Sequence, residues 1–244
     1  MTSGKPVNTL STMTSTAHSV QQQAALPATS RAEAARYALL RRLAPSMRHH
    51  LVVNLQPIGM VYEVMERRLR AAQPDLAEVH EGAHKINGFA RAALASCLDV
   101  VTWLAPEEDV LTSVEDGVRD CLGLLTTSLT FRGYAVRNEV IAVPGEIHRS
   151  AIRNVLTGAL VHLTDENPSP ADLVLTVEVS SAAAVLVLKV RPTDGDQGFP
   201  AEPGYRRLDA SDLEALAAAE AVTVAREGKQ RVRLAIPWAV KAAT

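Results

Sequence analysis

The sequence lacks a long hydrophobic run, an excess of charge of either sign, and more than two cysteines. No apolar stretch approaches the roughly 20 residues that a helix needs to cross a bilayer. The N-terminal stretch MTSGKPVNTLSTMTSTAHSVQQQ has no apolar core of a secretory signal. The formal net charge of −2 disfavours nucleic acid and anionic membranes as partners. Because Cys97 and Cys121 lie in periodic apolar segments, we expect a cytoplasmic protein with two buried, reduced thiols.

Apolar residues make up 47% of the 244 residues, which is enough to form the core of one large domain or two small ones. The N-terminal segment is rich in Ser, Thr and Gln, which predicts a disordered tail over 1–30. Pro106 interrupts a helical periodicity, and the pattern changes after it. We therefore expect a helical domain over 31–106 and an α/β domain over 107–244.

Two segments before Pro106 carry apolar residues at alternating spacings of three and four, which is the pattern of a helical seam. Pro74 marks a turn between them, so the two segments predict an antiparallel helical hairpin. One hairpin cannot bury both of its apolar faces, so we expect two copies to form a homodimeric four-helix bundle. The seams consist of Leu51, Leu55, Ile58, Tyr62, Met65 and Leu69, and of Leu76, Val79, Ala83, Ile86, Ala90, Ala93, Cys97, Val100 and Leu104.

The second half of the chain alternates helical and strand patterns. Ser113 and Asp116 are spaced like a capping box that opens a helix, and Gly133 is placed to end it. Strands are expected at 134–143, 172–180 and 184–190, helices at 146–163 and 209–221, and a terminal hairpin that turns at Glu227 and Gly228. This order predicts a two-layer α/β sandwich with the helices on one face of a sheet.

Two adjacent histidines, His49 and His50, lie in the first predicted helix. With the seam set at Leu51, His49 falls on the outer side of the helix. Pro57 is expected to bend the helix further along. An exposed histidine is commonly an ordinary surface residue, but exposed apolar neighbours favour a docking patch. The neighbours that share its face by helical spacing are Val53, Gln56 and Met60.

The spacing that starts at His49 resembles the phosphoacceptor motif of sensor histidine kinases, H-[ED]-L-x-x-x-L-x-x-I. Leu51, Leu55 and Ile58 match its apolar positions, and His50 stands at the acidic one. The stretch 152–163 is similar to the helix L-R-Q-V-L-x-N-L-x-x-N-A of that family's ATP-binding domain, and the order of elements fits over 36–238. The resemblance implies a dimeric phosphoacceptor hairpin followed by a histidine-kinase ATPase-like domain. It also implies that His49 is phosphorylated, with His50 as the alternative acceptor.

Several positions depart from the kinase pattern where the family binds ATP. Gly158 and His162 stand at the two asparagines of the family's helix, and an imidazole is a poor ligand for Mg²⁺. Pro192 stands where the family has an aspartate that contacts adenine, Asp194 offers only a shifted match, and the glycine-rich lid is missing. The departures imply a degenerate ATPase-like domain in which these positions no longer hold nucleotide.

The hairpin departs from the family as well. His50 replaces the acidic residue that assists autophosphorylation, and Val53 stands where phosphatase-competent members place an amide or hydroxyl. Asn54 lies one residue too far round the helix to supply that amide. Autokinase and phosphatase activities are therefore both expected to be weak or absent.

With ATP binding, autokinase and phosphatase activities disfavoured, the resemblance still allows phosphotransfer between the receiver domains of response regulators. A neutral imidazole is nucleophilic, and the receiver supplies Mg²⁺ and most of the charge stabilisation. The sequence therefore predicts a histidine phosphotransferase without a cofactor of its own. Its docking surface is expected to comprise Arg48, Val52, Val53, Gln56 and Met60.

Three other interpretations stay open. The chain could be a divergent histidine kinase with a rebuilt nucleotide site, or a non-catalytic module that docks on a kinase or receiver and does not need His49. His80 and His84 are spaced as a zinc pair on one helical face. No third ligand lies near them in the sequence, so we predict no metal site and a solvated helix face there.

Overall fold

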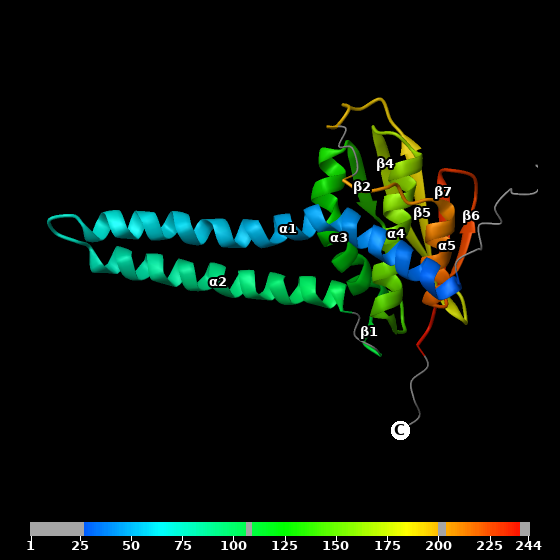
Figure 1. The fold of residues 1–244 in the computed structure, drawn as a ribbon, viewed down its shortest axis with the longest axis horizontal. Coiled ribbons are helices and arrows are strands. Elements are labelled where there is room, and N and C mark those ends of the chain that lie inside the picture. Colours follow the sequence, from blue (N-terminus) through cyan, green and yellow to red (C-terminus); the bar gives the residue numbers. More distant parts are fainter. Residues whose placement is uncertain (1–26, 106–108, 200–203, 240–244) are drawn as a thin grey trace, which may run out of the picture.

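The computed structural model describes residues 27–105, 109–199 and 204–239. It has a long helical hairpin, formed by α1 (Ala28–Leu69) and α2 (Leu76–Leu104), that projects from an α/β unit (Figure 1). Residues 1–26 of the expected tail lie outside the described residues, and α1 begins inside the range 1–30. Within the described ranges no helix is both long enough and apolar enough to cross a membrane.

The α/β unit has three helices on one face of a five-stranded sheet (Figure 1). The strand order is β2-β4-β5-β7-β6, in which β2 and β4 are parallel and the other neighbours antiparallel. The mixed α/β class is therefore confirmed. The elements are β1 (Leu111–Thr112), α3 (Val114–Phe131), β2 (Tyr134–Asn138), β3 (Ile147–His148), α4 (Arg149–Glu166), β4 (Ala171–Val179), β5 (Ala183–Pro192), α5 (Ala210–Ala219), β6 (Thr223–Arg226) and β7 (Arg231–Pro237).

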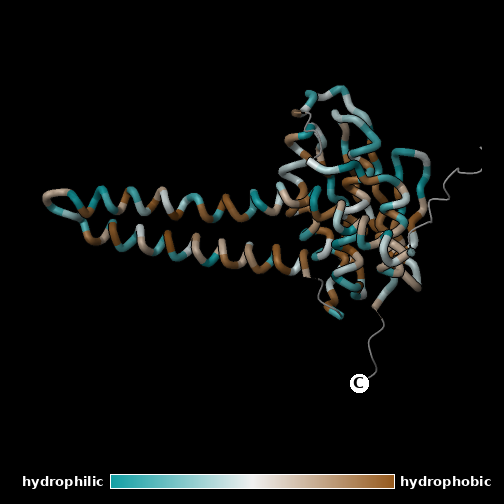
Figure 2. The backbone as a smooth tube through the Cα atoms, viewed as in Figure 1, coloured by the Kyte–Doolittle hydropathy of each residue, from teal (hydrophilic) through white to brown (hydrophobic). Residues whose placement is uncertain are grey.

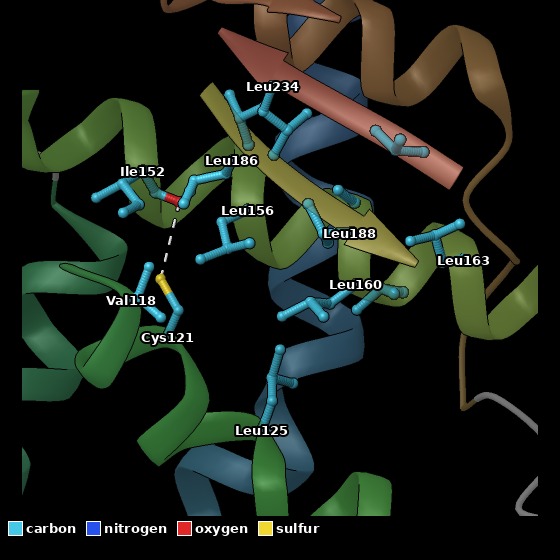
Figure 3. Packing of buried hydrophobic residues seen from close by; sticks show 14 of the residues in the cluster. Val118, Cys121, Leu125, Ile152, Leu156, Leu160, Leu163, Leu186, Leu188 and Leu234 are labelled. Carbon is cyan, nitrogen blue, oxygen red and sulfur yellow. Dashed lines mark hydrogen bonds between the residues drawn. The ribbon is translucent and has the colours of Figure 1, made fainter. Parts of the chain in front are cut away.

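Local signals in the sequence set the ends of several elements. The Ser113 hydroxyl accepts a hydrogen bond from the Asp116 backbone N–H at the start of α3, as the capping pattern predicts. Gly133 ends that helix region with φ +84, and a side chain there would also collide with the Gly198 backbone. The main core lies between α3, α4 and the sheet, where Cys121, Leu156 and Leu186 are buried together (Figure 3).

Each predicted seam of the hairpin divides into two series of residues seven apart. On α1, Leu51, Ile58 and Met65 are partly buried, and Met65 packs against Gly82 of α2. The other series, Leu55, Tyr62 and Leu69, is exposed at 50%, 57% and 49% within one chain. Figure 2 shows hydrophobic stretches along both hairpin helices, outside the α/β unit.

Helix α2 divides in the same way. Its partly or fully buried series is Val79, Ile86, Ala93 and Val100, and its exposed series is Leu76, Ala83, Ala90, Cys97 and Leu104. The expectation of two buried thiols is thus wrong for Cys97, which is exposed, and right for Cys121. The error has a physical cause, because both series have the same heptad spacing and only one can face the other helix of the chain.

The first part of α1 belongs to the α/β unit. Ala35, Leu39 and Leu43 are buried there, where α1 contacts α3, α4 and α5. Pro45 and Pro57 both lie inside α1, which continues through them, and the part over the α/β unit is inclined to the part in the hairpin (Figure 1). The expected domain boundary near residue 106 lies outside the described residues. The core of the α/β unit also includes residues far before that boundary, such as Leu39 and Leu43.

Candidate functional site

His49 and His50 lie on α1 where that helix leaves the α/β unit and enters the hairpin. His49 is exposed and His50 is partly buried, with their ring centroids 6.4 Å apart. A hollow opens between this turn of α1 and the end of α3. Its walls are formed by Pro45, Ser46, His49 and His50 of α1 and by Leu124, Thr127, Ser128 and Phe131 of α3.

The residues expected to surround His49 on the outer face of α1 are all exposed. This group comprises Arg48, Val52, Val53, Gln56 and Met60. Asn54 points elsewhere, because its amide donates to the Ser96 hydroxyl of α2 at 2.9 Å and to the His50 carbonyl at 3.1 Å. The side chain one turn beyond His49 is therefore the exposed Val53, which has no polar group to hold a water molecule.

His50 also lines a second hollow, on the side of α2. That hollow is bounded by Ser96, Asp99 and Trp103 among others. His50 therefore lies at the junction of α1, α2 and α3, whereas His49 lies on the open side of α1. The two histidines are neighbours in sequence but have different surroundings, and His49 is the more accessible of the two.

Arg153 of α4 connects the α/β unit to the end of α2, a role that the sequence did not reveal. Its guanidinium donates to the Thr102 hydroxyl at 2.6 Å and to the Asp99 carboxylate at 3.1 Å, and it lies 4.7 Å from the centroid of the Trp103 ring. The side chain is only 7% exposed. Burial, and then the charge of Arg153, lower the pKa of the neighbouring Arg149 guanidinium.

The positions expected to form the degenerate nucleotide site are not gathered around an open cleft. Gly158 is buried, and a Cβ added there would lie 2.8 Å from Leu216 of α5. His162 is fully buried, and its Nδ1 lies 3.0 Å from the Leu208 carbonyl just before α5. Asp194 is exposed in the loop after β5. Helix α5 therefore covers the face of α4 that carries Gly158 and His162.

The first part of α1 lies against the same region. Leu39 reaches within 4.0 Å of the Cβ position at Gly158. Arg42 pairs with Asp165 of α4 through two contacts of 2.6 and 2.7 Å, with the two side chains 7% and 4% exposed. Arg36 donates to Glu220 at 2.8 Å. Two helices thus fill this face of α4 with apolar side chains and internal ion pairs.

His80 and His84 are exposed on α2 with their rings stacked, 5.8 Å between centroids. Among the residues that the structure describes, no group of three or more His, Cys, Asp or Glu side chains could hold a metal ion. The pair therefore gains no third ligand from the fold.

Sequence reasoning placed His49 on an exposed face but missed the α3 wall beside it. Thr127, Ser128 and Phe131 come from a helix about 80 residues further along the chain. The available signal was the hydroxyl-rich stretch TTSLTF at 126–131, near the expected end of that helix. Nothing in that stretch says which surface it will face.

No family model matches the chain, and no curated protein matches it. Several solved structures are similar to the chain. The histidine kinase AdeS of Acinetobacter baumannii is 13% identical, with a TM-score of 0.40 over 75% of this chain and 97% of that one. A bacterial phosphotransferase is 15% identical, with a TM-score of 0.37 over 81% and 95%. The catalytic domain of the histidine kinase ThkA is 11% identical, with a TM-score of 0.41 over 54% and 98%. Because these scores are low, the function proposed next rests on residues of this chain.

Proposed function

We propose that this protein is a histidine phosphotransferase of a bacterial phosphorelay. His49 accepts a phosphoryl group from a phospho-aspartate of one receiver domain and passes it to the aspartate of another. The observation that carries this proposal is the exposure of His49 among exposed Val52, Val53 and Met60, on a face of α1 that a partner protein can reach. His50, more enclosed, is the alternative acceptor.

The transfer needs little from this chain beyond an accessible ring nitrogen. The lone pair of that nitrogen attacks phosphorus, the N–P bond forms and the acyl P–O bond breaks. The aspartate leaves as a carboxylate, and the imidazole keeps the proton on its other nitrogen. The receiver supplies Mg²⁺, and the docking surface of Arg48, Val52, Val53, Gln56 and Met60 holds the two proteins in line.

The filling of the α4 face supports a role without ATP. A nucleotide at Gly158 and His162 would have to displace Leu216 of α5 and Leu39 of α1. It would also disturb the buried pair of Arg42 and Asp165. The α/β unit then serves as a support for the hairpin rather than as a source of phosphoryl groups, which disfavours the divergent kinase.

A homodimer accounts for the exposed heptad series of the hairpin. The series that begins at Leu55 on α1 and the series that includes Ala90, Cys97 and Leu104 on α2 run along the hairpin without a partner inside one chain. Packing two hairpins together buries both series in a four-helix bundle. The Val53 and Met60 face stays free for a receiver.

The test is a labelled phosphotransfer assay with phosphorylated receiver domains from the same genome. Wild type is compared with His49→Ala and His50→Ala, and one sample contains labelled ATP without a receiver. We expect label to move to wild type and to His50→Ala but not to His49→Ala. Met60→Asp should slow the transfer, because it places a charge on the docking surface while leaving His49 in place.

Each other outcome identifies another function. Label from ATP alone would make the chain a divergent kinase. Loss of label in His50→Ala, with His49→Ala unaffected, would move the acceptor by one residue. If no receiver transfers label but receivers or kinases still bind, the protein is a non-catalytic docking module.

A further inference from the structure

The hollow beside His49 contains three hydroxyl groups that have no hydrogen-bond partner among the described residues. Ser46 lies one turn before His49 on α1, and Thr127 and Ser128 face it from α3. Within the described residues, none of these three hydroxyls takes part in a side-chain hydrogen bond. Each can therefore turn its O–H toward a group in the hollow.

Several other threonines on the helices donate to backbone carbonyls. Thr102, Thr126 and Thr164 donate to the carbonyls of Asp99, Leu122 and Leu160, at 2.7, 2.7 and 3.0 Å, and Thr157 donates to Arg153. This is the usual arrangement for a threonine inside a helix. Thr127 differs from its neighbour Thr126 in this respect, and its side chain lies in the wall of the hollow.

The electrostatic surroundings of the hollow suit an anion. None of the described residues that line it is acidic, so a phosphoryl group placed there meets no carboxylate. The His50 ring offers a further N–H donor. Leu124, which is buried, and Phe131, which is 63% exposed, form an apolar part of the wall of this open hollow.

We infer that this hollow is a phosphoryl-binding site, which holds the phosphoryl group of phosphorylated His49 between the hydroxyls of Ser46, Thr127 and Ser128. The inference depends on the proposed function for the source of the phosphoryl group, but not for the binding itself. Its consequence is a long-lived phosphohistidine. Hydrolysis forms an O–P bond from water, breaks the N–P bond and returns a proton to the ring nitrogen. Hydrogen bonds from the three hydroxyls stabilise the phosphoryl group on the ring nitrogen and so slow this step.

The experiment uses phosphoramidate, a small donor that phosphorylates histidine with loss of ammonia and needs no receiver. The full-length protein is phosphorylated, the reagent is removed, and the loss of phosphate from His49 is followed by mass spectrometry and ³¹P NMR. The variants are Thr127→Val with Ser128→Ala, and Ser46→Ala. Thr126→Val is the matched control, since that hydroxyl is bonded to its own helix. Circular dichroism and thermal melting verify that each variant is folded.

We expect the half-life of phosphorylated His49 to fall roughly three- to tenfold in the Thr127→Val, Ser128→Ala variant, by loss of hydrogen bonds to the phosphoryl oxygens. The Thr126→Val control should match wild type, and the ³¹P resonance should shift only in the variants of the hollow. Equal half-lives and equal ³¹P shifts in all folded proteins would overturn the inference, as would a failure of phosphoramidate to modify His49. If phosphoramidate labels His49 with these differences but no receiver does, the hollow stands and the phosphorelay function fails.

Discussion

Arg42 and Asp165 form a buried ion pair between α1 and α4, and without Arg42 the Asp165 carboxylate keeps only the Leu208 N–H at 3.1 Å and the distant Arg132 guanidinium at 4.0 Å. We expect Arg42→Ala to lower the free energy of unfolding by about 3–5 kcal/mol. Urea unfolding followed by circular dichroism measures this. Arg233→Ala is the control, because its partner Glu178 is exposed and the loss should be small. Equal effects of the two substitutions would mean that the Arg42 pair is open to water.

The two cysteines should differ sharply in reactivity. Burial raises the pKa of the Cys121 thiol, so little thiolate is present at neutral pH, and the side chain is also out of reach. Cys97 is exposed on the outer series of α2. With a thiol reagent and the Leu55→Asp variant, in which the contact between two hairpins is broken, we expect fast modification of Cys97 and modification of Cys121 only on unfolding, as read by mass spectrometry. Similar rates for both would contradict the burial of Cys121.

Single residues also show where sequence reasoning succeeds and where it stops. The leucine spacing sets the orientation of the helix, and it was enough to predict that His49 is exposed. Arg42 and Arg153 could not be predicted, because charged residues are ordinarily on the surface and their burial depends on carboxylates from other elements. Thr127 and Ser128 were equally out of reach, since the placement of α3 beside α1 is a property of the tertiary fold.

At the scale of elements, periodicity predicted the helices, the main strands and the hairpin, but not which apolar series faces which partner. Contacts within a chain and contacts between chains need the same heptad spacing. The series of Leu51 and the series of Leu55 are therefore equivalent in the sequence, and only the packing of α1 against α2 separates them. Capping residues such as Ser113 were predictable because their effect is local.

The exposed series of α1, which begins at Leu55, gives a prediction about dimerisation. We expect Leu55→Asp to convert a dimer to a monomer, because it places a charge in the apolar contact between two hairpins. Light scattering coupled to size-exclusion chromatography measures the mass. Met60→Asp is the control, since it changes an equally exposed apolar residue on the receiver-facing side and should leave the dimer intact. A monomeric wild type would contradict the dimer, and dissociation by Met60→Asp instead would move the contact to the other face.

Among the described residues, two connections between the hairpin and the α/β unit carry buried guanidinium groups. The first is α1 itself, a continuous helix from Ala28 to Leu69 that is tied to α4 through Arg42. The second is Arg153, which binds Asp99 and Thr102 near the end of α2. A rotation of the α/β unit would have to bend α1 and expose both guanidinium groups, so the α3 wall beside His49 has a fixed position.

That fixed position predicts a single distance between the two parts of the molecule. Spin labels are placed at the exposed Glu63→Cys in the hairpin and Lys229→Cys in the turn before β7, with Cys97→Ser and an excess of unlabelled chains. Pulsed electron spin resonance should give one narrow distance distribution, unchanged by phosphorylation of His49. Arg42→Ala combined with Arg153→Ala should broaden it, and Arg233→Ala should not. Two distances in wild type would mean that the α/β unit swings, and the hollow beside His49 would then exist in only one of two arrangements.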